Sequence, residues 1–152
     1  MSSSNHCTYI RNKSMKVSGL ILRSFTSKNK KLLVRAFKTY VRPILEYCSP
    51  VWNPHLLKDI NALEKVQRYF TKRLFIDKNI SYETRLELTG LERLELRRLH
   101  LDLCASYSII IQHQEPTNEF FSFNNNKTRA INSLKLNINR SRIDCRQCIL
   151  LQ

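Results

Sequence analysis

Only two glycines, Gly19 and Gly90, occur among the 152 residues of the chain. An all-β domain of this length needs many tight turns, and such turns use glycine because it adopts positive φ at no steric cost. The scarcity of glycine therefore favours helices over sheets.

Apolar residues recur at intervals of three and four in several segments, which is the spacing of one face of an α-helix. Five helices are predicted, over residues 6–25, 30–47, 55–75, 81–88 and 91–112. The second has the cleanest apolar stripe, made of Leu33, Phe37, Tyr40, Val41, Ile44 and Cys48. Pro43 should kink or divide this helix, because proline removes a backbone N–H and crowds the preceding turn. The sequence predicts an all-α bundle of about four to five helices.

Prolines and glycine also mark where the helices should end. Residues 49–54 contain two prolines and are predicted to be a helix-free break. Gly90 is predicted to cap the C-terminus of the fourth helix. The last helix should turn one stripe inward, made of Leu96, Leu99, Leu103, Tyr107 and Ile110. Residues 115–152 are rich in Asn and Ser and are predicted to be a loosely attached tail, which leaves 1–114 as the helical domain.

The chain is strongly basic, with 26 Lys and Arg against 12 Asp and Glu and a formal charge of +14. Self-repulsion at this charge opposes compaction, so an anionic partner is expected. Nucleic acid ranks first and an anionic membrane surface second. Every charged residue before Glu46 is basic, whereas acids and bases are interleaved afterwards. The positive field should therefore be strongest in the N-terminal half.

Two helices carry the candidate nucleic-acid-binding residues. On the second helix the bases recur at threes and fours opposite the apolar stripe, and on the third they lie on the outer face. The predicted phosphate contacts are Lys31, Arg35, Lys38, Arg42, Lys65, Arg68 and Lys72. The alternative is that these faces are merely solvated. Most aromatic residues fall on apolar stripes and are expected in the core, whereas Tyr69 lies off the stripe.

No set of residues is identified that could catalyse a reaction, and no cofactor or metal is expected. Surface ion pairs explain Glu92, Glu95 and Asp102, which lie among arginines at helical spacing. Cys145 and Cys148 form a C-x-x-C pair without the further ligands of a zinc site or the βαβ context of a redox pair. Five scattered cysteines and no apolar leader favour a reducing intracellular compartment, nuclear or cytoplasmic. No stretch is long and apolar enough to span a bilayer.

The string YVRPILEYCSPVW at residues 40–52 closely resembles the V-R-P-x-L-E-Y-x-S-P-V-W string of non-LTR (LINE, jockey-like) retrotransposon reverse transcriptases. In that family the string follows the polymerase palm. NKSMKV at 12–17 is similar to the helix just upstream, and LEKVQR at 63–68 resembles the family's L-E-x-V-Q-R helix. Residues 82–107 resemble a later run of the family that contains L-E-x-R-R-L. Residues 120–121 and 140–144 resemble the segment after it, so the resemblance covers nearly the whole chain.

The resemblance implies the thumb and following helices of such an enzyme. A polymerase thumb holds the template–primer duplex through its backbone, so it needs basic helices and no sequence readout. The implied partners are RNA or an RNA–DNA duplex and the palm domain of the parent polymerase. The family's metal-binding aspartates belong to a Y/F-A-D-D motif of the palm, and this chain has no Asp-Asp pair. No catalytic residue carries over, so the chain is not expected to be an enzyme on its own.

The family's palm motif and the tryptophan-containing string at the end of the family's sequence are both missing. We therefore expect a fragment cut at both ends, from a decayed genomic copy or open reading frame. Two other functions remain open. One is a basic helical module that binds an acidic protein or an anionic membrane surface. The other is a small metal or thiol enzyme that uses Cys145 and Cys148.

Overall fold

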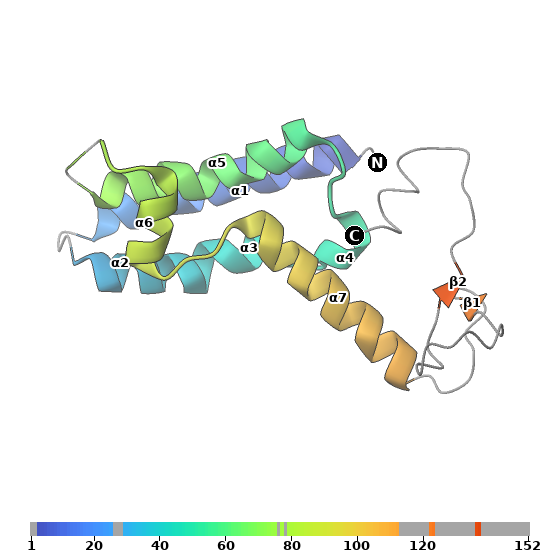
Figure 1. Cartoon of the computed structure of the whole chain (residues 1–152). Helices are drawn as coiled ribbons and strands as arrows, with labels where there is room; N and C mark the ends of the chain where they lie inside the picture. The colour runs from blue at the N-terminus through green and yellow to red at the C-terminus, as the bar shows by residue number, and fades with distance from the viewer. Residues whose placement is uncertain are drawn as a thin grey trace. The chain divides into compact units, whose positions relative to one another are not determined.

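The computed structural model describes residues 3–25, 29–75, 77, 79–112, 122–123 and 136–137. Its elements are α1 (Ser3–Ser24), α2 (Lys30–Ala36), the π-helical turn η1 (Phe37–Val41), α3 (Arg42–Glu46), α4 (Ser49–Trp52), α5 (Leu57–Leu74), α6 (Tyr82–Thr89) and α7 (Leu94–Gln112) (Figure 1). Two antiparallel strands of two residues each, β1 (Ser122–Phe123) and β2 (Leu136–Asn137), complete the described elements. The prediction of an all-α fold is confirmed.

The chain divides into two compact units, Met1–Asp102 and Leu103–Gln152, and the boundary lies within α7. In the first unit α1 and α5 run side by side, while α2, η1 and α3 follow one another beside this pair (Figure 1). Helix α6 contacts both α5 and α2. The predicted domain boundary after residue 114 falls outside the described residues, as does most of the predicted tail.

The core of the first unit lies between α1, α5 and the stretch formed by α2, η1 and α3. The three-four spacing also predicts an apolar stripe on the third helix, from Leu56 to Leu74. Its members on α5 are buried, namely Ile60, Leu63, Val66, Phe70 and Leu74. The exception is Leu56, which precedes the helix and is 45% exposed. The rings of Phe37 and Phe70 are both fully buried, and their centroids lie 4.6 Å apart at an interplanar angle of 32°. Aromatic packing of this kind joins η1 to α5.

Pro43 divides the second predicted helix, and the division takes the form of a π-helical turn. The N–H of Arg42 donates to the carbonyl of Phe37, one residue further back than in an α-helix. Pro43 then lies in the first turn of α3, where a missing N–H costs no hydrogen bond. The extra residue in the turn shifts the helical register, so Tyr40 is 61% exposed although it belongs to the predicted stripe. Cys48, the last member of that stripe, is also exposed because α3 ends before it.

The segment predicted to be free of helix contains the single turn α4, and that prediction is wrong. Pro50 occupies its first turn, where proline is tolerated, and Cys48 precedes it with a left-handed φ of 52°. The indole Nε1 of Trp52 donates to the carbonyl of Tyr47 at 2.8 Å. The Trp52 ring also meets the ring of His6 edge-on, with 5.2 Å between centroids. These contacts close the turn and attach it to α1.

Helix α6 begins and ends within one residue of the predicted range 81–88. The hydroxyl of Ser81 accepts from the N–H of Thr84 and caps the N-terminus. Gly90 adopts φ 60° and ψ 40°, and its N–H donates to the carbonyl of Glu87 at 3.1 Å. The predicted glycine cap is therefore confirmed.

Helix α7 buries a different face from the one predicted. Leu96, Leu103 and Tyr107 are 57%, 54% and 65% exposed, so their predicted inward placement is wrong. The side chain of Ile110 lies outside the described set. Leu94 and Arg98 are buried instead, and they have helical spacing too. Apolar periodicity did not identify this buried face, because the face contains an arginine. None of the helices in the described ranges combines the length and apolarity needed to cross a bilayer.

Candidate nucleic-acid interface

We call the four basic residues predicted on one face of the second helix the ridge (Lys31, Arg35, Lys38 and Arg42). Three of them line one groove. Lys31 and Arg35 on α2 and Lys38 on η1 are exposed, and Lys30 joins them. The groove has a volume of about 490 Å³, and its remaining walls are Val34, Phe75, Leu88 and Thr89. No acidic residue is among these lining residues. We call this feature the cationic groove.

Two of the four cations are held by contacts across the groove. The Nζ of Lys38 donates to the carbonyl of Gly90 at 3.0 Å, and the Nζ of Lys30 lies 4.4 Å from the ring centroid of Phe75. The side chain of Asn29 caps α2 by accepting from the N–H of Lys31. A long side chain that is already oriented loses less conformational entropy when it binds a ligand. The tertiary structure therefore orients two of the cations of the groove.

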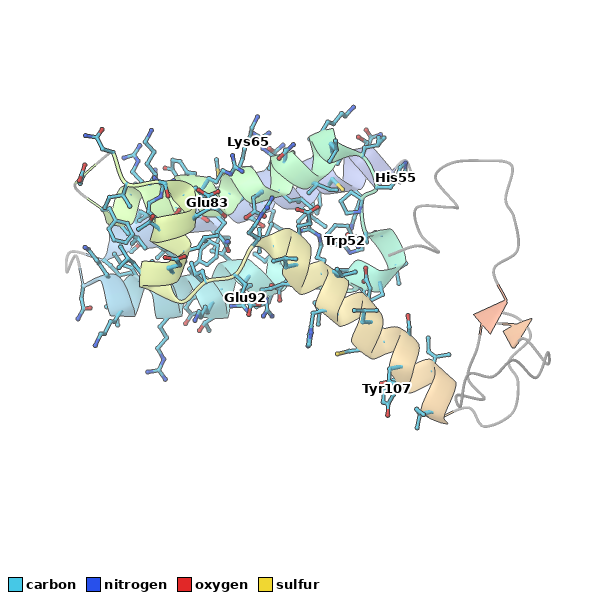
Figure 2. The ribbon with its side chains drawn as sticks, viewed as in Figure 1. Trp52, His55, Lys65, Glu83, Glu92 and Tyr107 are labelled. Carbon is cyan, nitrogen blue, oxygen red and sulfur yellow. The ribbon has the colours of Figure 1, made fainter. Side chains whose placement is uncertain are left out.

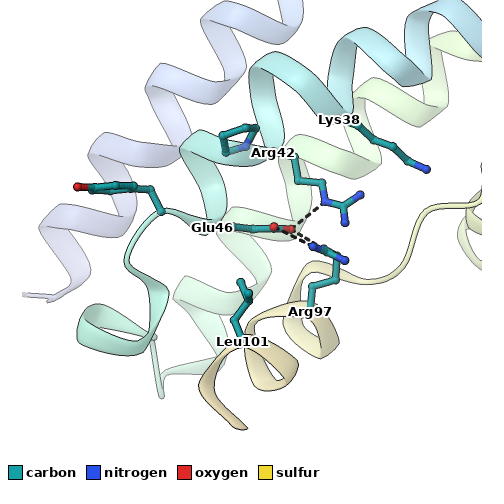
Figure 3. A pocket seen from close by; sticks show the side chains of 7 residues that line it. Lys38, Arg42, Glu46, Arg97 and Leu101 are labelled. Atoms are coloured by element: carbon teal, nitrogen blue, oxygen red, sulfur yellow. Dashed lines mark hydrogen bonds and ion pairs between the residues drawn. The ribbon is translucent and has the colours of Figure 1, made fainter. Parts of the chain in front are cut away.

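Arg42, the fourth predicted ridge residue, is engaged in an ion-paired cluster (Figure 3). Its Nε lies 3.0 Å from an oxygen of Glu46, and Arg97 binds the same carboxylate at 2.6 and 3.1 Å. The hydrogen bond to Glu46 is the main reason that the pKa of Arg97 is raised. Glu46 offsets part of this positive charge. The positive field expected around the ridge is therefore reduced at Arg42.

The predicted residues of α5 lie on its outer face. Lys65, Arg68 and Lys72 are exposed, and Lys65 stands at the outer edge of the bundle (Figure 2). The guanidinium of Arg68 lies over the ring of Tyr82 in α6, 4.8 Å from its centroid. Arg68 thus lies at the first turn of α6, while Lys38 contacts Gly90 at its other end. Helix α6 connects the two basic helices.

Aromatic side chains divide between the core and the surface. Phe37 and Phe70 are buried as expected, whereas Tyr9, Tyr40 and Tyr47 are 61%, 61% and 77% exposed. Tyr69 is half-buried, with the guanidinium of Arg73 5.4 Å from its ring centroid. The apolar pattern did not single out Tyr47, because it follows the end of α3 and its orientation depends on the turn before α4.

Residues of the LEKVQR string hold the start of α7 in place. Glu64 is 2% exposed and accepts from the N–H of Leu94 at 3.1 Å and from the hydroxyl of Tyr82. Gln67 donates to that hydroxyl at 3.1 Å and to the carbonyl of Glu92 at 2.9 Å. Burial, and then the hydrogen bond to Glu64, raise the pKa of Tyr82 above its usual range. This part of the string therefore has a structural role.

Asn53, next to the YVRPILEYCSPVW string, joins α7 to the loop after α4. Its Nδ2 donates to Asp102 at 2.5 Å, and its Oδ1 accepts from Nε of Arg98 at 3.2 Å. Arg98 and Asp102 were expected to form a surface ion pair, but Arg98 is 1% exposed and both bind Asn53 instead. Burial lowers the pKa of Arg98 and raises the pKa of Asp102. The ion pairs expected of Glu92 and Glu95 are confirmed, with Arg97 at 3.6 Å and Arg93 at 3.2 Å.

Within the part of the chain that the structure describes, no group of three or more His, Cys, Asp or Glu residues could hold a metal ion. Cys145 and Cys148 lie outside that part.

No protein-family model matches the sequence, and no solved structure matches it. An uncharacterised protein of Caenorhabditis elegans is 27% identical over 109 residues, which is 70% of this chain and 54% of that protein. The chain thus spans about half the length of this relative.

Proposed function

We propose that the chain is the duplex-holding, thumb-like part of a non-LTR retrotransposon reverse transcriptase. The cationic groove is its contact with the phosphate backbone. The observation that carries the proposal is the gathering of Lys30, Lys31, Arg35 and Lys38 along one groove without an acidic lining residue. The choice of polymerase family in this proposal rests on the resemblance at residues 40–52.

The groove suits a backbone ligand because its polar groups are donors on long side chains. Such groups neutralise phosphates and release condensed counterions, which gives affinity without sequence readout. An RNA–DNA hybrid or a duplex RNA presents a continuous row of these phosphates. The metal-dependent chemistry would come from the palm of the parent polymerase, since this chain has no paired aspartates.

Residues within and beside the strings that carry the resemblance support the proposal through the fold. Glu64 and Gln67 fix the start of α7, and Asn53 fixes Arg98 and Asp102. These contacts stabilise the bundle whose α2 and η1 form the cationic groove. A thumb needs a rigid helical frame of this kind, because it positions the duplex by shape and charge.

The proposal is tested by the salt dependence of duplex binding. The triple variant Lys31→Gln, Arg35→Gln, Lys38→Gln removes three cations of the groove. We expect it to weaken binding to a labelled RNA–DNA hybrid of any sequence. The slope of log K against log salt should fall by up to about three units, because each phosphate contact contributes roughly 0.9. Fluorescence anisotropy over a salt series measures both effects.

The matched control is Lys13→Gln, Lys16→Gln, Arg23→Gln, which removes the same charge from exposed positions of α1 outside the groove. Arg97 and Arg98 are unsuitable controls, because one is ion-paired and the other buried. Equal losses from the two triple variants would show that only net charge matters. Binding to anionic vesicles or to an acidic protein, with none to nucleic acid, would favour the interaction-module alternative.

A further inference from the structure

A second groove, of about 470 Å³, lies next to the cationic groove and shares Lys38 with it. Its other lining residues are Arg42, Pro43, Glu46, Tyr47, Arg97 and Leu101 (Figure 3). They come from α3, the turn after it, and α7. We call it the mixed groove, because it combines cations with apolar side chains.

Glu46 organises the polar side of the mixed groove. Its carboxylate holds the guanidinium groups of Arg42 and Arg97 next to one another, where two cations alone would repel. The contact with Arg42 uses only Nε, so the two terminal nitrogens of that guanidinium can still donate to an anion. Arg42, Arg97 and Glu46 together keep one positive charge, which the exposed Glu92 partly offsets at 3.6 Å from Arg97, and Lys38 adds another. The arrangement suits one phosphate better than a row of them.

The apolar side of the mixed groove is made of Pro43, Tyr47 and Leu101. Tyr47 is 77% exposed although its ring is large and mostly apolar. An exposed ring beside cations is the combination on which unpaired bases stack while their phosphates are neutralised. The bases of a duplex are already stacked on one another, so this ring offers little to paired nucleotides.

We infer that the mixed groove binds an unpaired nucleotide of a strand whose neighbouring phosphates lie in the cationic groove. Its phosphate contacts the terminal nitrogens of Arg42, and its base stacks against Tyr47. Lys38 lies on both grooves and links the two sites. The inference deepens the proposed function and rests on it, since it assigns the chain to a junction between duplex and single strand.

Three labelled probes test the inference: a blunt RNA–DNA hybrid, the same hybrid with a short unpaired extension, and the extension strand alone. The variants are Tyr47→Ala, Tyr47→Phe and the control Tyr9→Ala, which removes another exposed tyrosine ring, on α1. We expect the wild-type chain to bind the extended hybrid more tightly than the blunt one. Tyr47→Ala should weaken binding of the extended hybrid about fivefold or more, with blunt-hybrid affinity unchanged. Tyr47→Phe and Tyr9→Ala should behave as wild type, and circular dichroism checks that each variant folds.

Equal affinity for blunt and extended hybrids would overturn the inference and leave the proposed function standing. Equal losses from Tyr47→Ala and Tyr9→Ala would also overturn it. If the single strand binds through Tyr47 and the blunt hybrid does not bind, the nucleotide site stands and the duplex-holding function fails. If no probe binds, both fail.

Discussion

Buried polar side chains, rather than apolar ones alone, fix how α7 meets the rest of the first unit. Asn53 uses its donor on Asp102 and its acceptor on Arg98, so a single amide forms hydrogen bonds with two charged groups. An amide can do this because it carries a donor and an acceptor on one planar group. The two charged partners titrate in opposite directions from their usual values, since burial penalises both ionised forms.

Asp102→Asn should raise stability at neutral pH. Burial raises the pKa of Asp102, so the folded chain holds its carboxyl proton more tightly than the unfolded chain does. The stability that this tighter proton binding gives to the fold is present at low pH. It is lost as the pH rises through the pKa of Asp102 in the folded chain. Asparagine has no such titration and keeps an acceptor for Asn53. The melting temperature of the variant should therefore exceed that of wild type at neutral pH, and the difference should shrink as the solution is acidified.

A variant that is less stable than wild type by the same margin at every pH would contradict this expectation. Thermal melts followed by circular dichroism across the acid-to-neutral range provide the comparison.

At the scale of single elements, the two glycines differ in their place in a helix and in their backbone conformation. Gly90 ends α6 with a left-handed backbone, whereas Gly19 lies inside α1. A Cβ built at either position meets no atom within 4 Å beyond its chain neighbours and the local helix backbone, so packing does not separate them. The difference lies in the backbone alone.

Gly90→Ala should lower the free energy of unfolding by about 1–2 kcal/mol, the cost of a left-handed L-residue. Gly19→Ala should raise it by about 0.4–1 kcal/mol, because alanine reduces the freedom of the unfolded chain and favours the helix. Urea denaturation of the two variants measures both values. Changes of the same sign would show that the conformation of one of the two glycines differs from the one described.

At the scale of the whole molecule, the first unit is held by a core that joins segments distant in sequence. Phe37 on η1 packs on Phe70 of α5, and Cys7 and Ile10 on α1 belong to the same cluster. Apolar burial of this kind is the main favourable contribution to folding. The cationic groove depends on it, because its walls come from η1, α2 and the residues around α6.

Phe70→Ala should therefore lower the free energy of unfolding by about 3–5 kcal/mol, through lost burial and the cavity left behind. Leu57→Ala removes a side chain of the same helix that is 73% exposed, and should change it by less than about 0.5 kcal/mol. Denaturant titrations of the pair give the comparison. Similar losses from both changes would mean that the core does not lie where the structure has it.

The sequence by itself determined the longer helices, the division at Pro43 and the cap at Gly90, but it missed α4. Each depends on forces that act within a few neighbouring residues: apolar periodicity, a missing N–H and the φ preference of glycine. The same reasoning placed Lys31, Arg35 and Lys38 on one face of a helix, because spacing alone decides which side chains share a face.

Only the tertiary structure decided which face of α7 is buried and how the charges are paired. Glu46 meets Arg97 across 51 positions of the chain, and Asn53 meets Arg98 across 45. Such contacts depend on how distant surfaces fit together, and periodicity along one helix carries no information about that fit. The register shift of the π-helical turn acts in the same way, since it exposes Tyr40 by rotating it from a stripe that an unbroken α-helix would bury. Burial of a charged residue such as Arg98 also depends on a distant segment, since Asn53 accepts a hydrogen bond from its Nε.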